Sequence, residues 1–478
     1  MRIAVIGAGG SRTPQLVETF LRQADRIHLD CLSLMDTNPG KLAIMGGLCR
    51  QIARETSSRV ELHCTGNAVE ALDQAKYVIT TLRVGEERGR ILDERIALNC
   101  GVLGQETTGA GGFAMAMRSI PTLLEYAELV QKLNPGAWII NFTNPAGLVI
   151  QALHDRGYAR AIGICDSANG ARKAVEAFLR VPAIRLRDQV FGLNHLSWTR
   201  SVSLEGDELL PGLLQDDGFL SSSKLRLFEP ALVKRIGMYL NEYLFYYYHP
   251  ELALGEISRG KKTRGEEIEE WNRALLDRLS CIDLESHGEE ALKVYRVYRK
   301  QRSASYMDYN LADGSFDLVS SRLRGEFPTR KEITGPGATE PGENARNDMP
   351  DEGGYAGVAL EVIDALEGGQ PALTAVNFPN GEAIRCMKPE DVVEVSCRID
   401  TQGVHPLPIG EIPEHQELLM RSVKRFERLS LEAIGTRSRI KATEAMMAHP
   451  LVLSFSLASR LVEEYIRAHA AYVGNWGE

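Results

Sequence analysis

The chain opens with a strand, a glycine-rich turn and a helix, an order that few folds accommodate. Residues 2–7 have the sequence RIAVIG, an apolar run typical of a buried parallel strand. The chain continues as GAGGSRTPQLVETFL, in which Thr13 can cap a helix and Pro14 can take its first position. This order predicts the first unit of a parallel sheet with helices on both faces.

The glycine turn is a candidate site for a dinucleotide. Gly7, Gly9 and Gly10 let the backbone approach a pyrophosphate, and the helix N-terminus offers amide donors to its charge. A tight turn without a ligand is the alternative, because the full GxGxxG spacing is absent. Asp36, after the predicted strand 32–35, can accept the ribose hydroxyls of NAD, or it can cap the following helix.

Three further apolar runs, residues 77–82, 138–142 and 161–164, alternate with helical stretches. We therefore predict an α/β protein with an N-terminal Rossmann-like, doubly wound parallel sheet and a C-terminal α+β domain. We place an NAD-binding domain at residues 1–167 and a substrate- and metal-binding domain at 168–478. Ligands bind beyond the carboxyl ends of such strands. Here these ends carry Arg83, Asn141, Asn144 and Cys165.

Cys165 and His195 are candidate ligands of a divalent transition metal. Each lies at or just past the end of an apolar run typical of a strand, so both side chains can face one cleft. A thiolate and a neutral imidazole leave coordination positions open for substrate oxygens. The alternative is that both residues only pack in the core, where cysteine often behaves as a small hydrophobe.

Other segments give weaker signals. Residues 101–121 contain five glycines in twelve residues around Gln105 and Glu106, which predicts either a close backbone approach to a ligand or a surface loop. Residues 231–249 carry five tyrosines at helical spacing. This spacing is typical of an amphipathic helix, and we expect four of the five to pack on the core. The basic cluster in 255–270 indicates a solvated helix start or an anion site.

The remaining chain is predicted to be mostly helical. We expect helices at 355–366 and over much of 417–472, a strand at 390–397, and a lid in the Gly- and Pro-rich segment 325–354. The formal net charge of −9 argues against a nucleic-acid surface and requires a locally basic pocket for any anionic substrate. Without a leader, an apolar span or a CxxC pair, we expect a cytoplasmic protein with reduced thiols.

Several motifs together resemble one family. GAGGSRTP, TLRVGEERGRILDERIALNCGVLGQETTGAGG, RSIP, NFTNPAG, GIC and FGLNHLSW lie within about the first 200 residues, followed by KTRGEE, GGY and EDVVEV. The chain is similar to glycoside hydrolase family 4, most closely to its 6-phospho-β-glucosidase branch. The resemblance implies a glycosidase with NAD+ and a divalent metal, commonly Mn2+, in a fold like that of lactate and malate dehydrogenases. It also implies a homodimer or homotetramer.

The resemblance implies roles for individual residues. It makes Cys165 and His195 the metal ligands and Tyr243 the general base. The positions matching the cofactor site are Gly7, Gly9, Ser11 and Asp36, and those matching the substrate and phosphate site are Arg90, Asn144 and Arg264. Asp166 stands in CDSANG, where the phospho-β branch usually has Asn. In the phospho-α branch an Asp at this position resembles the general acid, so Asp166 is either an acid or a residue that orients the metal site.

The family chemistry explains these residue types. Oxidation at C3 of the sugar by NAD+ makes the C2 proton acidic, and a metal on the C2 and C3 oxygens stabilises the enediolate. Tyr243 removes that proton, for which we expect its pKa to be lowered by nearby positive charge. The aglycone is then eliminated from C1, water adds, and the hydride returns to C3.

Three alternatives stay open at this point. The first is a 6-phospho-α-glucosidase that uses the same chemistry. The second is an NAD-dependent dehydrogenase of the lactate or malate kind, which needs no metal and would tolerate Cys165→Ser. The third is a non-catalytic NAD-binding sensor. Neither of the last two accounts for NFTNP, GQET and the Cys/His pair together.

Overall fold

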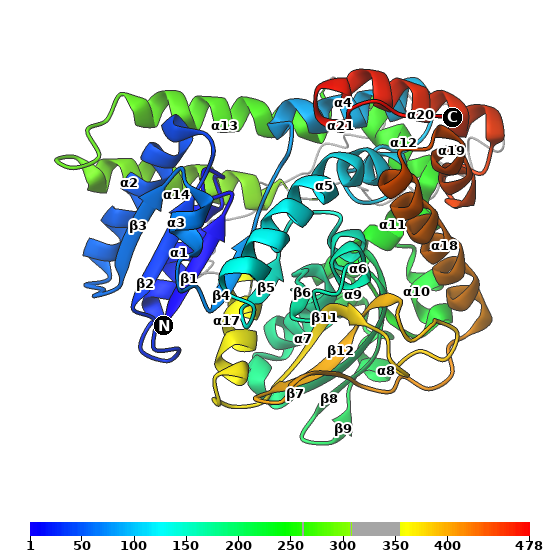
Figure 1. Ribbon diagram of the computed structural model, residues 1–478. Helices are drawn as coiled ribbons and strands as arrows, with labels where there is room; N and C mark the ends of the chain where they lie inside the picture. The colour runs from blue at the N-terminus through cyan, green and yellow to red at the C-terminus, as the bar shows by residue number, and fades with distance from the viewer. Residues whose placement is uncertain (261, 306, 308–353) are drawn as a thin grey trace, which may run out of the picture.

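A computed structural model describes residues 1–260, 262–305, 307 and 354–478 (Figure 1). One nine-stranded sheet runs through it, in the order β13-β12-β11-β6-β5-β4-β1-β2-β3. The predicted lid, residues 325–354, lies outside the described residues except for Gly354.

The six strands from the N-terminal part of the chain are parallel to one another. They are β1 (Arg2–Ile6), β2 (Cys31–Met35), β3 (Glu61–Thr65), β4 (Tyr77–Thr80), β5 (Trp138–Asn141) and β6 (Ala161–Gly163). Sequence analysis predicted all of these except β3, whose residues are only partly buried and lack an apolar run. Three antiparallel strands complete the sheet: β11 (Ala372–Pro379), β12 (Val392–Asp400) and β13 (Gly403–Pro406).

The sheet is covered on both faces, as its alternating side chains require. Ile3 and Val5 of β1 belong to one hydrophobic core, and Ala4 and Ile6 belong to another. The first core includes residues from α1 (Thr13–Arg22), α2 (Pro39–Glu55), α7 (Gly170–Leu179), α14 (Gly288–Ala304) and α17 (Tyr355–Leu366). The second includes residues from α5 (Ala110–Leu133), α6 (Ala146–Asp155) and the C-terminal helices. The predicted doubly wound α/β fold is confirmed.

A smaller antiparallel sheet lies beside β12. It consists of β7 (Leu186–Leu193), β8 (Leu196–Leu204), β9 (Asp207–Glu208) and β10 (Tyr239–Leu240). The Ser396 hydroxyl on β12 connects the two sheets, because it accepts from the Val190 amide at 2.9 Å and donates to the Asp188 carbonyl at 3.0 Å. His195 lies just past the end of β7, as predicted, in the tight turn between β7 and β8.

The tyrosine-rich segment 231–249 is not one helix, so the expected helical face does not form, although Tyr239 and Tyr246 are buried in the core and Tyr247 and Tyr248 pack against it. It divides into α10 (Pro230–Ile236), β10, a 3-10 turn (Glu242–Leu244) and α11 (Phe245–Tyr248). Gly237 ends α10 with a φ of +68°, a conformation that favours glycine. The Asn241 side chain then accepts from the Tyr243 amide at 3.0 Å and starts the next turn. Tyr243 is thereby turned toward the main sheet.

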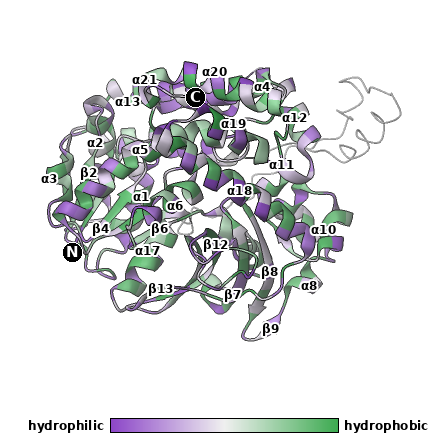
Figure 2. Ribbon diagram, turned by 45° about the vertical axis from the view of Figure 1, so that its right-hand side comes forward, coloured by the Kyte–Doolittle hydropathy of each residue, from purple (hydrophilic) through white to green (hydrophobic). Residues whose placement is uncertain are grey.

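The C-terminal segment is largely helical, as predicted. It forms α18 (Glu414–Thr436), α19 (Arg439–Ala448), α20 (Phe455–Ala468) and α21 (Ala470–Val473). Of these, α20 packs next to α4 (Glu86–Asn99) at the top of Figure 1. Hydrophobic and hydrophilic residues alternate along helices such as α18 (Figure 2), whose buried apolar residues belong to both cores. None of the described helices is long and apolar enough to cross a membrane.

A buried ionic network ties these C-terminal helices to the main fold. Arg118 on α5 donates to both oxygens of Asp93 on α4 at 2.7 Å, and His469 lies 2.7 Å from the same carboxylate. All three side chains are fully buried. Arg118 also donates to the Val84 carbonyl at 3.1 Å, which holds the loop after β4.

We expect Arg118→Met to lower the free energy of unfolding by about 3–5 kcal/mol, because it leaves the buried Asp93 carboxylate without its guanidinium and with only the His469 imidazole beside it. Chemical denaturation followed by circular dichroism measures this change. The control is Arg296→Met, which removes a surface ion pair with Glu55 and should cost less than about 1 kcal/mol. Equal losses in the two variants would contradict the prediction.

Candidate active site

A large cavity lies beyond the carboxyl ends of the parallel strands, where a doubly wound sheet places its ligands. Its volume is about 1440 Å³, enough for a dinucleotide and a sugar together. Residues just past four strands line it: Gly7 after β1, Asp36 after β2, Phe142 after β5 and Asp166 after β6. Residues from α13 (Arg264–Ser280), α14 and the start of α17 close the opposite side.

The glycine turn has the close contacts expected of a cofactor-binding loop. Gly7 has a φ of +96°, and a Cβ there would lie 2.6 Å from the Thr81 carbonyl oxygen. A Cβ on Gly9 would lie 2.8 Å from the Asp36 carboxylate. Only glycine fits at these two positions, so the backbone is exposed to the cavity.

Asp36 is held at the edge of the cavity by backbone donors. Its two carboxylate oxygens accept from the Gly9 amide at 2.7 Å and the Asn38 amide at 2.8 Å. Asp36 does not cap the following helix, because Asn38 does so by accepting from the Lys41 amide at 3.1 Å. Each carboxylate oxygen keeps a further lone pair for a hydroxyl group.

Helix α1 begins without a side-chain cap, contrary to the expectation for Thr13. Arg12 is the N-cap residue, and its side chain makes no capping bond. The Thr13 hydroxyl is buried inside the helix start and has no hydrogen-bond partner in the described part of the chain. Since the first amides of a helix carry partial positive charge, this uncapped end suits an anion. Ser11, just before it, accepts from Arg302 at 2.6 Å and from Tyr298 at 2.9 Å.

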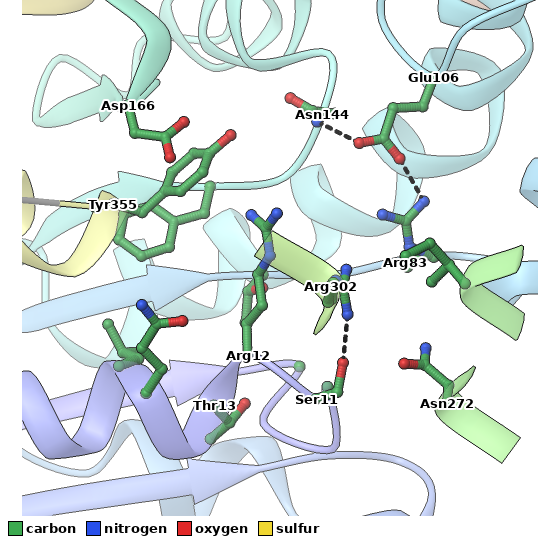
Figure 3. A pocket seen from close by; sticks show the side chains of 18 of the residues that line it. Ser11, Arg12, Thr13, Arg83, Glu106, Asn144, Asp166, Asn272, Arg302 and Tyr355 are labelled. Atoms are coloured by element: carbon green, nitrogen blue, oxygen red, sulfur yellow. Dashed lines mark hydrogen bonds and ion pairs between the residues drawn. The ribbon is translucent and has the colours of Figure 1, made fainter. Parts of the chain in front are cut away.

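Glu106 is the centre of the polar network at the other end of the cavity (Figure 3). It accepts from Arg83 at 2.7 Å and from Asn144 at 2.9 Å, and Arg90 lies 3.1 Å away. Burial opposes ionisation of this carboxyl, but the Arg83 and Arg90 guanidiniums outweigh it and hold its pKa well below the usual range. The predicted substrate residues Arg90 and Asn144 therefore meet on one carboxylate.

Arg264 stands apart from this network, at the start of α13. It lines the cavity, contacts Glu267 at 3.2 Å and Ser305 at 3.0 Å, and lies over the Trp271 ring. Its helix is fixed to α4 by Glu94, which accepts from the Gly265 amide at 2.7 Å.

Cys165 and His195 lie behind the cavity wall and do not face it directly, since each is at most 2% exposed. Tyr243 lines the cavity in front of them. Its ring stacks on the His195 imidazole with centroids 3.6 Å apart and planes 8° from parallel. Face-to-face stacking leaves the in-plane lone pairs of an imidazole accessible to a ligand.

The His195 imidazole fits a metal ligand. Neither of its ring nitrogens has a hydrogen-bond partner among the described residues, although the ring is buried. Burial lowers its pKa to about 3, so the imidazole is neutral at physiological pH, as metal binding requires. Within the described chain no cluster of three or more His, Cys, Asp or Glu residues could hold an ion. A metal here would therefore have two protein ligands and open positions.

The pKa of Tyr243 does not move in the expected direction. Burial raises it well above the usual value, and the neighbouring Cys165, Glu242 and Glu106 add to this effect. Burial likewise raises the pKa of the Cys165 thiol, followed by the effect of Glu394. The expectation of a lowered Tyr243 pKa is thus wrong for the chain alone, because the groups around the phenol are acids. A cation beside these groups would reverse the shift.

Glu394, which sequence analysis did not single out, holds the His195 turn. It accepts from Ser197 at 2.9 Å, from Asn377 at 3.0 Å and from Asn194 at 3.1 Å. These bonds fix the residues on both sides of His195, whose backbone has the strained φ of +62°. Burial raises the pKa of Glu394 to about 7. Its only sequence signal was its place in the EDVVEV strand.

Asp166 faces the cavity next to Tyr355, and the Arg12 side chain reaches into the space between Asp166 and Asn144 (Figure 3). The Arg12 guanidinium lies 5.4 Å from the centre of the Tyr355 ring. Sequence analysis missed Arg12, Arg302 and Tyr355 as cavity residues. Tyr355 and Arg302 come from helices far along the chain, and only the tertiary fold brings them to the glycine turn.

Known proteins share both the sequence pattern and the fold. A probable 6-phospho-beta-glucosidase of Bacillus subtilis is 29% identical over 482 residues, covering 99% of this chain and 97% of the relative. A 6-phospho-alpha-glucosidase of Lacticaseibacillus paracasei is 27% identical over 490 residues, covering 98% and 97%. The 6-phospho-beta-glucosidase of Thermotoga maritima, solved with manganese, NAD+ and glucose-6-phosphate, superposes with a TM-score of 0.78, 26% identity and complete coverage of both chains.

Family models match almost the whole chain. The family 4 glycosyl hydrolase model matches residues 2–181, and the model of the C-terminal domain of that family matches residues 190–452. These matches confirm the predicted family and extend it through the region where the sequence motifs were diffuse. The chain therefore belongs to glycosyl hydrolase family 4 and is a glycoside hydrolase.

Proposed function

We propose that the chain is a 6-phospho-β-glucosidase that works with NAD+ and a divalent metal, preferably Mn2+. The observation that carries this proposal is the buried group of Cys165, His195 and Tyr243 beside a cavity with an exposed glycine turn. The relatives named for 6-phosphoglucosides support the substrate class, and the structure of one of them holds the same two cofactors.

The cofactor end of the cavity suits NAD+. Gly7, Gly9 and the uncapped start of α1 would receive the pyrophosphate, and Ser11 stands beside them. The Asp36 carboxylate would accept the ribose hydroxyls and repel a 2′-phosphate, which favours NAD+ over NADP+.

The other end would hold the sugar. Glu106 orients Asn144 and Arg90 toward the cavity, and Arg264 approaches from α13. When bound, NAD+ supplies a hydride acceptor for C3 of the sugar, and the divalent ion supplies a Lewis acid for the neighbouring oxygens. Cys165 and His195 would hold that ion.

Tyr243 would act as the base that removes the C2 proton. Its ring is fixed against His195, so its phenol oxygen lies near the metal ligands. Burial, and then the acidic surroundings, raise the pKa of the phenol, and a bound cation would oppose this shift. Proton removal by Tyr243 would thus depend on a loaded metal site.

The first test is release of p-nitrophenol from the β and α anomers of p-nitrophenyl glucoside 6-phosphate. We expect hydrolysis of the β anomer, abolished by omitting NAD+ or by adding EDTA. Omitting NAD+ and chelating the metal should each lower the rate at least about 100-fold, because proton removal from C2 requires both the cofactor and the metal. Hydrolysis without NAD+, or steady reduction of NAD+ by a hydroxy acid, would contradict the proposal and favour a dehydrogenase.

A second test concerns the metal ligands. Cys165→Ser and His195→Ala should each weaken Mn2+ binding at least about 10-fold, because each removes a direct ligand. Electron paramagnetic resonance of free Mn2+ measures this affinity without turnover. Since burial raises the pKa of Cys165, ion binding should release a proton, and affinity should rise with pH in the wild type. Cys281→Ser, at an exposed thiol, is the control.

The α anomer is the second candidate substrate, because the Asp166 carboxylate faces the cavity directly after Cys165 (Figure 3). In that position it could protonate the glycosidic oxygen as a general acid. Hydrolysis of the α anomer alone in the first assay would select this candidate.

We expect the effect of Asp166→Asn on kcat/KM to depend on the leaving group of the substrate. If Asp166 donates a proton, the variant should lose about 100-fold or more in kcat/KM on a methyl glucoside 6-phosphate. It should lose much less on the p-nitrophenyl substrate, whose phenolate leaves without a proton. A similar loss on both substrates would instead indicate that Asp166 orients the metal site.

A further inference from the structure

Some of the guanidinium groups that line the cavity form ion pairs with carboxylates, and others do not. Arg83 and Arg90 pair with Glu106, Arg264 pairs with Glu267, and Arg299 pairs with Glu18 at 3.2 Å. Arg12 and Arg302 also line the cavity, but neither forms an ion pair with a carboxylate anywhere in the described chain. Burial opposes the Arg12 charge, and the nearby Tyr355, Asp166 and Glu106 outweigh it and raise the pKa of Arg12, but no described carboxylate lies within ion-pair distance of it.

Arg302 reaches the cavity from α14 and makes only neutral contacts. One nitrogen donates to the Ser11 hydroxyl at 2.6 Å and to the Tyr298 hydroxyl at 2.7 Å. Burial, and then the charge of Arg12 with a smaller effect of Arg83, lowers the pKa of Arg302. Like charges therefore crowd together here in a partly enclosed space, which is costly without a counter-ion.

Arg12 points from the start of α1 toward the middle of the cavity (Figure 3). Its side chain has no hydrogen bond within the described residues, and its guanidinium lies over the Tyr355 ring. The ionisable groups nearest its charge, Tyr355, Asp166, Glu106 and Tyr243, belong to the sugar side of the cavity. An anion between Arg12 and Arg302 would thus lie between the glycine turn and the sugar.

We propose that Arg12 and Arg302 together bind the 6-phosphate of the substrate. A phosphate dianion would neutralise both charges, and guanidinium groups can bind it through paired N–H donors. Arg90 is less suited to this task, because its Nε and Nη1 atoms already contact Glu94 at 2.7 Å and Glu106 at 3.1 Å. This inference rests on the proposed function and assigns its phosphate specificity to two residues that sequence analysis passed over.

The test measures ligand binding to the protein loaded with NAD+ and Mn2+, by isothermal titration calorimetry. We expect the wild type to bind glucose 6-phosphate much more tightly than glucose. Arg12→Gln and Arg302→Gln should each lower the affinity for glucose 6-phosphate about 10- to 100-fold, because each removes a charge-assisted hydrogen bond to the phosphate. Glucose binding should be unchanged, and NAD+ affinity should stay within about threefold, since this pair is not assigned to the pyrophosphate.

Matched variants separate this role from a structural one. Arg296→Gln also removes a positive charge from α14, but at a position outside the cavity, so it should leave glucose 6-phosphate binding unchanged. Arg12→Lys and Arg302→Lys keep the charge and should recover part of the affinity. If Arg302→Gln lowers the melting temperature, Arg12→Gln still tests the site, because the Arg12 side chain makes no hydrogen bond in the described structure.

Two results would overturn the inference. One is unchanged glucose 6-phosphate binding in both Gln variants while the wild type prefers the phosphorylated sugar. The other is a selective loss of NAD+ affinity, which would assign the pair to the cofactor pyrophosphate. A wild type that binds glucose and glucose 6-phosphate equally would overturn the proposed phosphoglucosidase function itself.

Discussion

The ionised carboxylate of Glu106 organises the functional end of the molecule. It joins the loop after β4 through Arg83, helix α4 through Arg90 and the loop after β5 through Asn144. The loop after β5 is distant in sequence from the other two segments, and a charge with several donors in a partly buried site fixes all three more firmly than packing alone. The sheet brings its strand ends to one edge, and this carboxylate turns that edge into one wall of a cavity.

The two sides of the cavity favour bound ligands of opposite charge. Around Cys165, His195 and Tyr243, burial favours the neutral thiol, imidazole and phenol, and nearby acids add to this effect for the thiol and the phenol. Around Arg12 and Arg302, cations crowd without a carboxylate partner in the described chain. The first side therefore favours a bound cation and the second a bound anion. A phosphorylated sugar with a divalent ion would satisfy both, in a chain whose net charge is −9.

Much of this arrangement could be predicted from local patterns. The apolar runs of β1, β2, β4, β5 and β6 and the glycine turn required only short stretches of sequence. Strand β3 and the breaks in residues 231–249 were missed, because weak burial and a single left-handed glycine leave little trace in periodicity. Thr13 looked like a helix cap, yet its hydroxyl is buried within the helix start.

The sequence by itself determined the doubly wound sheet, the family and the residue types of the site, because strand periodicity, glycine spacing and long motifs are local properties. Only the tertiary structure decided which charges are paired. In it the Tyr243 ring stacks on His195, and Arg90 forms ion pairs with two carboxylates. Arg302 on α14 donates a hydrogen bond to Ser11. The contact between Arg302 and Ser11 joins residues 291 positions apart, and no local pattern encodes such a distance.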